Sequence, residues 1–74
     1  MDLRCKLVAK KDLYGKIKKG DVITFITQAR YGANPSLDEI SQAVANFTGH
    51  TDPKHPQVRN MAQLANYQMT IERV

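Results

Sequence analysis

The sequence predicts an α+β fold, a three-stranded antiparallel sheet with helices packed on one face, and three observations lead to it. Residues 3–9 and 22–27 have the pattern or composition of strands, and residues 67–74 close the chain with a third such segment. Between them, residues 37–47 carry an amphipathic helical stripe. The chain has 74 residues, and because domains commonly run to roughly 100–150 residues we expect residues 1–74 to form one small globular domain.

The first strand is predicted by alternation. Apolar residues alternate with mostly basic residues along positions 3–10, and a period of two places the two sets on opposite faces of a strand. The apolar face is formed by Leu3, Cys5, Leu7 and Ala9, and the other face by Arg4, Lys6, Val8 and Lys10.

The second strand, residues 22–27, is predicted from its β-branched and aromatic composition. Its apolar residues fall on both faces, with Ile23 and Phe25 on one and Val22 and Ile26 on the other. A polar connection, residues 11–20, has a glycine near each end, and the short separation favours antiparallel pairing with the first strand.

The helix has start and stop signals. Ser36 and Glu39 match a capping box, in which each side chain accepts a hydrogen bond from the other residue's backbone N–H. Gly49 is placed to end the helix in a left-handed conformation. The apolar stripe consists of Leu37, Ile40, Val44 and Phe47.

The segment before the last strand allows two interpretations. The loop at residues 50–56 contains two prolines and is neither helix nor strand. A short second helix capped near Asp52 or His55 would explain the spacing of Val58, Met61, Ala62, Leu64 and Ala65. A strand starting at Met61 is the alternative, because apolar residues also alternate from there to residue 71.

These elements favour a β-β-α-(α)-β chain with strand order 2-1-3, every neighbouring pair antiparallel, and a right-handed helical crossover. The expected core combines the inward face of each strand with the apolar stripe of the helix. The strands contribute Leu3, Cys5, Leu7, Ile23, Phe25, Tyr67, Met69 and Ile71, and the helix covers them with Ile40, Val44 and Phe47.

The sequence offers few candidate residues for catalysis or metal binding. Cys5 lies on the apolar face of a strand, where a thiol is usually inert packing. His50, Asp52 and His55 share one loop, but their spacing matches no common zinc pattern. The glycines and lysines of residues 15–20 lack the spacing of a phosphate-binding loop. We therefore expect no enzymatic activity, no cofactor and no metal.

The charge is concentrated in the first half, with eight basic and three acidic residues in positions 1–31 and a net charge of +4 overall. A basic cluster of this kind could neutralise phosphates of DNA or RNA without sequence preference, while an aromatic ring nearby stacks on a base. The candidate nucleic-acid-binding residues are Arg4, Lys6, Lys10, Lys11, Tyr14, Lys16, Lys18 and Lys19. The alternative interpretation is that these lysines keep a loop solvated and discourage edge-to-edge strand pairing.

The leading prediction is a non-enzymatic interaction domain that binds a protein partner or a second copy of itself. Helices on one face of the sheet would leave Val8, Val22 and Ile26 as an exposed apolar patch on the other, and such patches often mark interfaces. A second covering layer made by residues 28–35 is the alternative. The weak, non-specific nucleic-acid binder is the second functional prediction.

Three stretches resemble a family of short, uncharacterised bacterial proteins of the Bacteroidetes type. They are residues 18–23, residues 45–47 within the helix, and residues 70–74. The resemblance implies a bacterial, cytoplasmic protein and carries no site. No segment approaches the roughly 20 apolar residues that span a bilayer, so we expect no membrane association, and a single cysteine fits a reducing compartment.

Overall fold

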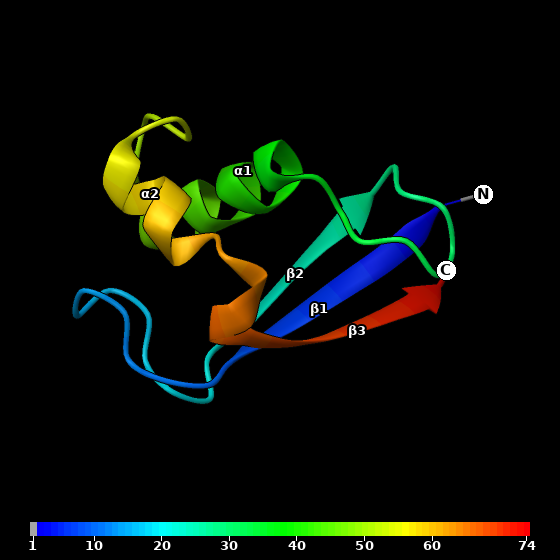
Figure 1. Cartoon of the computed structure of the whole chain (residues 1–74), viewed down its shortest axis with the longest axis horizontal. Helices are drawn as coiled ribbons and strands as arrows, with labels where there is room; N and C mark the ends of the chain where they lie inside the picture. Colours follow the sequence, from blue (N-terminus) through cyan, green and yellow to red (C-terminus); the bar gives the residue numbers. More distant parts are fainter. Residues whose placement is uncertain (1) are drawn as a thin grey trace.

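The computed structural model describes residues 2–74 and contains one sheet with its helices on a single side (Figure 1). Its strands follow the order β2-β1-β3 and both neighbouring pairs are antiparallel. This is the predicted topology. The elements are β1 (Leu3–Ala9), β2 (Val22–Thr27), α1 (Leu37–Thr48), α2 (Pro56–Met61), the 3-10 turn η1 (Leu64–Asn66) and β3 (Tyr67–Arg73).

β1 is the central strand, and its alternation decides which side of the sheet is covered. Cys5 lies opposite Phe25 on β2 and Ile71 on β3, and all three point to the helical side. Lys6 lies opposite Thr24 and Thr70, whose side chains are exposed on the other side. The predicted apolar face of β1 is confirmed, because each of its four residues is at most 3% exposed.

α1 begins and ends where the sequence predicted. The Ser36 hydroxyl accepts from the Glu39 backbone N–H at 3.2 Å, and the Glu39 carboxylate accepts from the Ser36 backbone N–H at 3.4 Å. Gly49 ends the helix with φ of 76°, in the left-handed region that glycine adopts without a Cβ clash. The capping box and the glycine stop are both confirmed.

The prediction of an apolar stripe on α1 is confirmed for the middle of the helix and is wrong for its two ends. Ile40 and Val44 are buried, whereas Leu37 and Phe47 are each 44% exposed. Both exposed residues lie in the terminal turns, which neighbouring elements cover only in part. The rest of the buried surface comes from small residues, Ser41, Ala43 and Ala45, which allow close packing.

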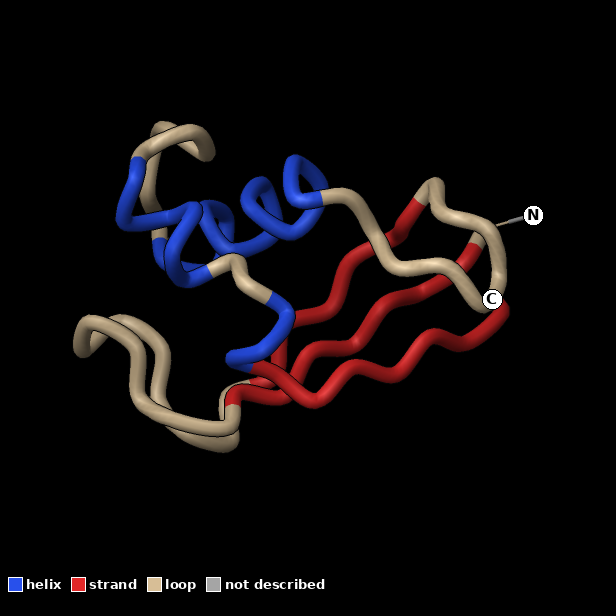
Figure 2. The backbone as a smooth tube through the Cα atoms, viewed as in Figure 1, coloured by secondary structure: helices blue, strands red, loops and turns tan. Residues whose placement is uncertain are grey.

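The connection between β1 and β2 is less polar than predicted. Leu13 and Ile17 are 6% and 0% exposed and belong to the core. A turn through Tyr14 and Gly15, both with positive φ, brings them together, and their backbones exchange hydrogen bonds of 2.8 and 3.2 Å. The same connection appears in Figure 2 as the long tan loop at one end of the sheet.

α2 is the predicted second helix, and the cap is His55. Its imidazole Nδ1 accepts from the Gln57 backbone N–H at 3.1 Å, and Pro56 occupies the first helical position. The helix ends at Met61, and the strand alternative from Met61 onward is wrong, because β3 begins only at Tyr67. The Tyr67 hydroxyl donates to the Met61 carbonyl at 2.6 Å and ties the two elements together.

The predicted core is confirmed for most of its members. Phe25, Met69 and Ile71 are only partly buried, and Phe47 lies outside the core. These four residues lie near the edges of the sheet, where fewer elements pack over them. Within residues 2–74, the core gains Leu13 and Ile17 from the connection, Val58 and Met61 from α2, and Ala62 from the cap that follows α2.

Candidate interaction surface at the edge of the sheet

Cys5, the one nucleophilic thiol, is packed inside the sheet–helix interface. It is fully buried, and this burial, with a smaller contribution from the Glu39 carboxylate, raises the pKa of the thiol from 9.0 to about 11. A thiol in this state is protonated at neutral pH and is a poor nucleophile.

The histidines and the neighbouring aspartate stabilise their own loop. The Nδ1 atoms of His50 and His55 each accept a backbone N–H at 3.1 Å, from Asp52 and Gln57, and the two rings lie 4.8 Å apart. The Asp52 carboxylate accepts from the Lys54 N–H at 2.9 Å. In the part of the chain that the structure describes, no three His, Cys, Asp or Glu residues form a group that could hold a metal ion.

The face of the sheet opposite the helices is open. The loop at residues 28–35 was a candidate cover, but Tyr31 to Asn34 line a pocket with Met69 and Ile71, which point to the helical side. The covering alternative is therefore wrong. Val22 and Ile26, which point to the open side, are 43% and 49% exposed.

The open face carries two separate apolar spots. Val8 lies opposite Val22, but Ile26 lies opposite Arg4 at the other end of the strand pair. The Arg4 guanidinium in turn lies 3.8 Å from the Glu72 carboxylate. The expected single patch of Val8, Val22 and Ile26 is therefore interrupted by polar and charged neighbours.

The outer edge of β2 is the most unusual feature of this surface. Edge strands normally carry charges or prolines that discourage pairing with other chains. β2 reads Val-Ile-Thr-Phe-Ile-Thr and has neither, whereas the other edge strand, β3, carries Glu72 and Arg73. The lysines that were expected to discourage edge pairing lie in the preceding loop and not on the strand.

Backbone groups at this edge are free to pair. The Ala9 N–H donates to the Asp21 carbonyl at 2.9 Å and continues the β1–β2 ladder. Because antiparallel ladders alternate, the next outward-pointing N–H and C=O groups belong to Val22, Thr24 and Ile26. Within residues 2–74, no backbone hydrogen bond outside the strand ladder reaches these three residues.

Apolar side chains border the β2 edge on both sides. On the helical side, a groove between β2 and α1 is lined by Phe25, Ala43, Asn46 and the half-exposed Phe47. On the open side lie Val22 and Ile26. We call this combination the β2 edge site: the outer edge of residues 22–27 with the groove under α1. The sequence did not indicate that Phe47 lines this groove, because its helical spacing assigned it to the buried face of the helix.

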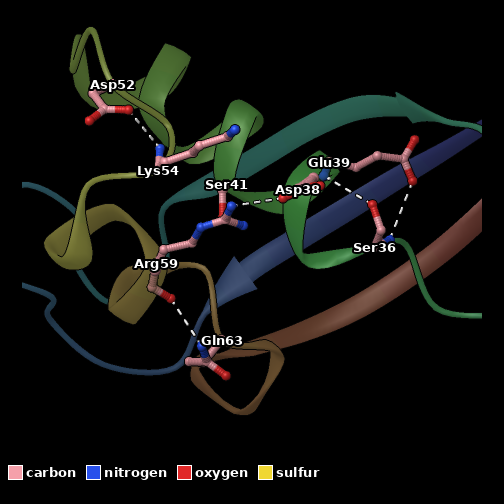
Figure 3. A network of polar contacts seen from close by, with 8 residues as sticks. All are labelled: Ser36, Asp38, Glu39, Ser41, Asp52, Lys54, Arg59 and Gln63. Atoms are coloured by element: carbon pink, nitrogen blue, oxygen red, sulfur yellow. Dashed lines mark hydrogen bonds and ion pairs between the residues drawn. The ribbon is translucent and has the colours of Figure 1, made fainter.

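Polar contacts hold α1 beside this edge, and Figure 3 shows those at the start of α1 and between α1 and Arg59 of α2. The Glu39 carboxylate accepts from the Thr27 hydroxyl at 2.9 Å and from the Gln28 N–H at 2.8 Å, which joins the helix to the end of β2. From the other side, Arg59 of α2 lies 2.8 Å from the Asp38 carboxylate and donates to the Ser41 hydroxyl at 3.2 Å. The groove is therefore bounded by fixed elements.

The predicted nucleic-acid residues are divided between two places. Arg4 and Lys6 project from β1 on the open face. Tyr14 is 54% exposed, but its hydroxyl accepts from the Asn60 amide at 3.2 Å. The lysines exposed on the connection between β1 and β2 are Lys10, Lys11, Lys16, Lys18 and Lys19.

The connection has a fixed shape although its lysines are solvated. The Lys19 N–H donates to the Asp12 carboxylate and the Lys18 N–H to the Asp21 carboxylate, each at 2.8 Å. The side-chain ammonium groups have no such partner, since the ion pairs found among residues 2–74 involve only arginines. This leaves a positive cluster at the entrance to β2.

Comparison of the chain with models of protein families, with curated proteins and with solved structures finds no match. The resemblance to short bacterial proteins therefore stays a prediction. Among residues 2–74, no helix has the length and apolar character to cross a membrane, and α1, with 12 residues, is the longest of them.

Proposed function

We propose that this chain is a non-enzymatic protein–protein interaction domain that binds an extended segment of another polypeptide chain as an additional strand on β2. The observation that carries the proposal is the β2 edge site, an uncharged edge strand with outward backbone groups and apolar side chains on both sides. The added strand belongs either to a second copy of the chain or to a different protein.

Strand addition matches the chemistry of this surface. In this mode, main-chain hydrogen bonds supply affinity, and pockets for alternate side chains supply specificity. Val22, Thr24 and Ile26 offer the main-chain groups, and the groove beside Phe25 and Phe47 accepts side chains from the helical side. Catalysis has no comparable support, because Cys5 is buried with a raised pKa.

A strand peptide tests the proposal. A six-residue peptide of alternating valine and threonine, with uncharged glutamines added at its ends for solubility, is titrated into the isotopically labelled chain while backbone amide NMR signals are recorded. We expect saturable shifts concentrated at residues 22–27. A peptide of the same length with prolines at its two central positions is the control, since adjacent prolines remove a donor from each edge of the peptide. Absence of shifts with the first peptide would contradict strand addition.

A second candidate function is weak, non-specific binding of nucleic acid. It is supported by the five exposed lysines of the connection, whose ammonium groups are not engaged by carboxylates of residues 2–74. We expect binding of a short oligonucleotide to weaken steeply between about 50 and 200 mM salt, because counterion release drives such binding. No binding at low salt would eliminate this candidate.

We also propose a cytoplasmic location. The free thiol of Cys5 is buried, and the fold is built without a disulfide, which suits a reducing compartment. Fractionation of cells expressing the tagged chain, with a cytoplasmic and an exported marker, tests this location.

A further inference from the structure

We infer that the segment recognised by the β2 edge site carries acidic residues beyond its pairing residues, on the C-terminal side. This inference rests on the proposed function and names the partner that the site fits. It follows from the charge of the loop at one end of β2, the direction of pairing, and the side chains that border the edge.

The positive charge lies at one end of the site. Lys18 and Lys19 precede Val22 by four and three residues, so their Cα atoms lie within about 14 Å of its Cα even if the chain is extended. Their backbone N–H groups are fixed by Asp21 and Asp12, while their side chains are exposed. Asp21 lies between Val22 and these lysines, and its carboxylate accepts the Lys18 N–H. Acidic groups on a docked strand would therefore meet the positive charge of the lysines beyond Asp21, without displacing an ion pair found among residues 2–74.

The direction of pairing decides which end of the partner is acidic. Antiparallel pairs are slightly more stable per residue than parallel ones, and both existing pairs of this sheet are antiparallel. An antiparallel strand on β2 places its C-terminal end beside Val22 and the lysine loop. With six residues in β2, the pairing segment spans about 20 Å.

The side chains of the segment follow from the two borders of the edge. Positions that point to the helical side enter the groove beside Phe25 and Phe47, which favours apolar side chains. Positions that point to the open side meet Val22, Thr24 and Ile26, which favours β-branched residues. The segment is therefore an uncharged β-forming stretch of about six residues followed by aspartates or glutamates.

Charge argues against a second copy as the occupant. In antiparallel self-pairing, residues that follow β2 in the second copy would extend toward the lysine loop. Those residues are Gln28, Ala29 and Arg30, so the approaching charge would be positive. Each copy also carries a net charge of +4, and like charges across an interface oppose association.

Three peptides with one common pairing core test the inference. They carry three glutamates after the core, three glutamates before it, or three glutamines after it, and each is labelled for fluorescence anisotropy. We expect the first to bind about tenfold more tightly than the second at low salt. The preference should diminish at about 0.5 M salt, where exposed charges are screened.

A matched pair of double substitutions locates the effect. Lys18→Gln with Lys19→Gln should remove most of the preference, and both substitutions keep the backbone N–H groups that order the loop. Lys10→Gln with Lys11→Gln is the control, because it removes the same charge from the other side of the connection, where the Lys10 N–H donates to the Asn66 carbonyl beside β3. Circular dichroism checks that both variants are folded.

The outcomes separate this inference from the function on which it rests. Equal affinity of all three peptides, with NMR shifts at residues 22–27, would overturn the acidic partner and leave strand addition in place. No binding of any peptide would overturn both. A dimer of the chain alone, seen by sedimentation and lost in Thr24→Pro, would assign the edge to a second copy and overturn the inference.

Discussion

The Glu39 carboxylate accepts a hydrogen bond of 2.9 Å from the Thr27 hydroxyl, and this contact joins the first turn of α1 to the last residue of β2. Thr27 is 2% exposed, and its hydroxyl also accepts from the Ala29 N–H at 3.0 Å. Glu39 thereby serves both the helix cap and the edge strand. The groove of the β2 edge site depends on this junction, because it sets where α1 starts relative to the strand.

Removing the hydroxyl tests this junction. Thr27→Val keeps the shape of the side chain but leaves the Ala29 N–H and one Glu39 oxygen without this partner. We expect the free energy of unfolding, measured by urea denaturation, to fall by about 1–2 kcal/mol. Thr24→Val is the control, since Thr24 is exposed and the change should stay within about 0.5 kcal/mol. Equal stability of the two variants would show that the junction does not stabilise the fold.

Two prolines test which backbone groups point outward. Thr24 and Thr70 both lie opposite Lys6, one on each edge strand. The ladder pattern directs the Thr24 N–H away from β1 and the Thr70 N–H toward it. Thr70→Pro should therefore lower the free energy of unfolding by about 3 kcal/mol or more, whereas Thr24→Pro should cost much less.

The same pair reports on binding. Thr24→Pro removes an outward donor from the edge, so we expect strand-peptide affinity to fall about tenfold, and more if the ring also blocks the ladder. Thr24→Ala, which keeps the N–H, is the control and should bind the peptide nearly as well as the unmodified chain. Unchanged affinity in a folded Thr24→Pro chain would show that peptides bind elsewhere.

Cys5 should react slowly with thiol reagents while the protein is folded. Burial raises the pKa of its thiol from 9.0 to about 11, so the thiolate fraction at pH 8 is about a hundredfold lower than for an unperturbed thiol. Labelling with a chromogenic disulfide at pH 8 should therefore be slow in buffer and rapid in denaturant. Rapid labelling of the folded chain would mean that the thiol is accessible.

Stability should decline at alkaline pH. Burial raises the pKa of Tyr67 from 10.0 to about 12, and that of Cys5 also lies above its unfolded value. A group with a raised folded pKa contributes stability that is present below its unfolded pKa and is lost as pH rises toward the folded value. We therefore expect the free energy of unfolding to fall between about pH 9 and pH 12.

Tyr67→Phe separates the two groups. It removes the hydroxyl that donates to the Met61 carbonyl at 2.6 Å, so stability near pH 7 should fall by about 1–2 kcal/mol. The decline above about pH 10 should become shallower, because Cys5 is then the remaining group whose pKa burial raises. An identical pH profile in the variant would show that Tyr67 is not the group responsible.

Parts of the interaction surface were accessible to sequence reasoning. The exposure of Val22 and Ile26 follows from a period of two once Ile23 and Phe25 are assigned to the core side. The clustering of lysines before β2 is visible in the chain itself. Phe47 and the lack of charge on the exposed edge became informative only when β2 was seen beside α1, since neither feature marks a surface on its own.

Local signals determined the elements of this protein. The Ser36–Glu39 capping box, the Gly49 stop and the alternation of Leu3 to Ala9 each depend on groups a few residues apart, so the sequence alone specifies them. The tertiary structure decided which residues of these elements are buried and which remain exposed. Leu13 and Ile17 are buried because a turn places them in the core, and Leu37 and Phe47 stay 44% exposed because the rest of residues 2–74 covers the ends of α1 only in part. The burial of a residue depends on its contacts with elements far away in the sequence, and a local sequence pattern contains no information about those contacts.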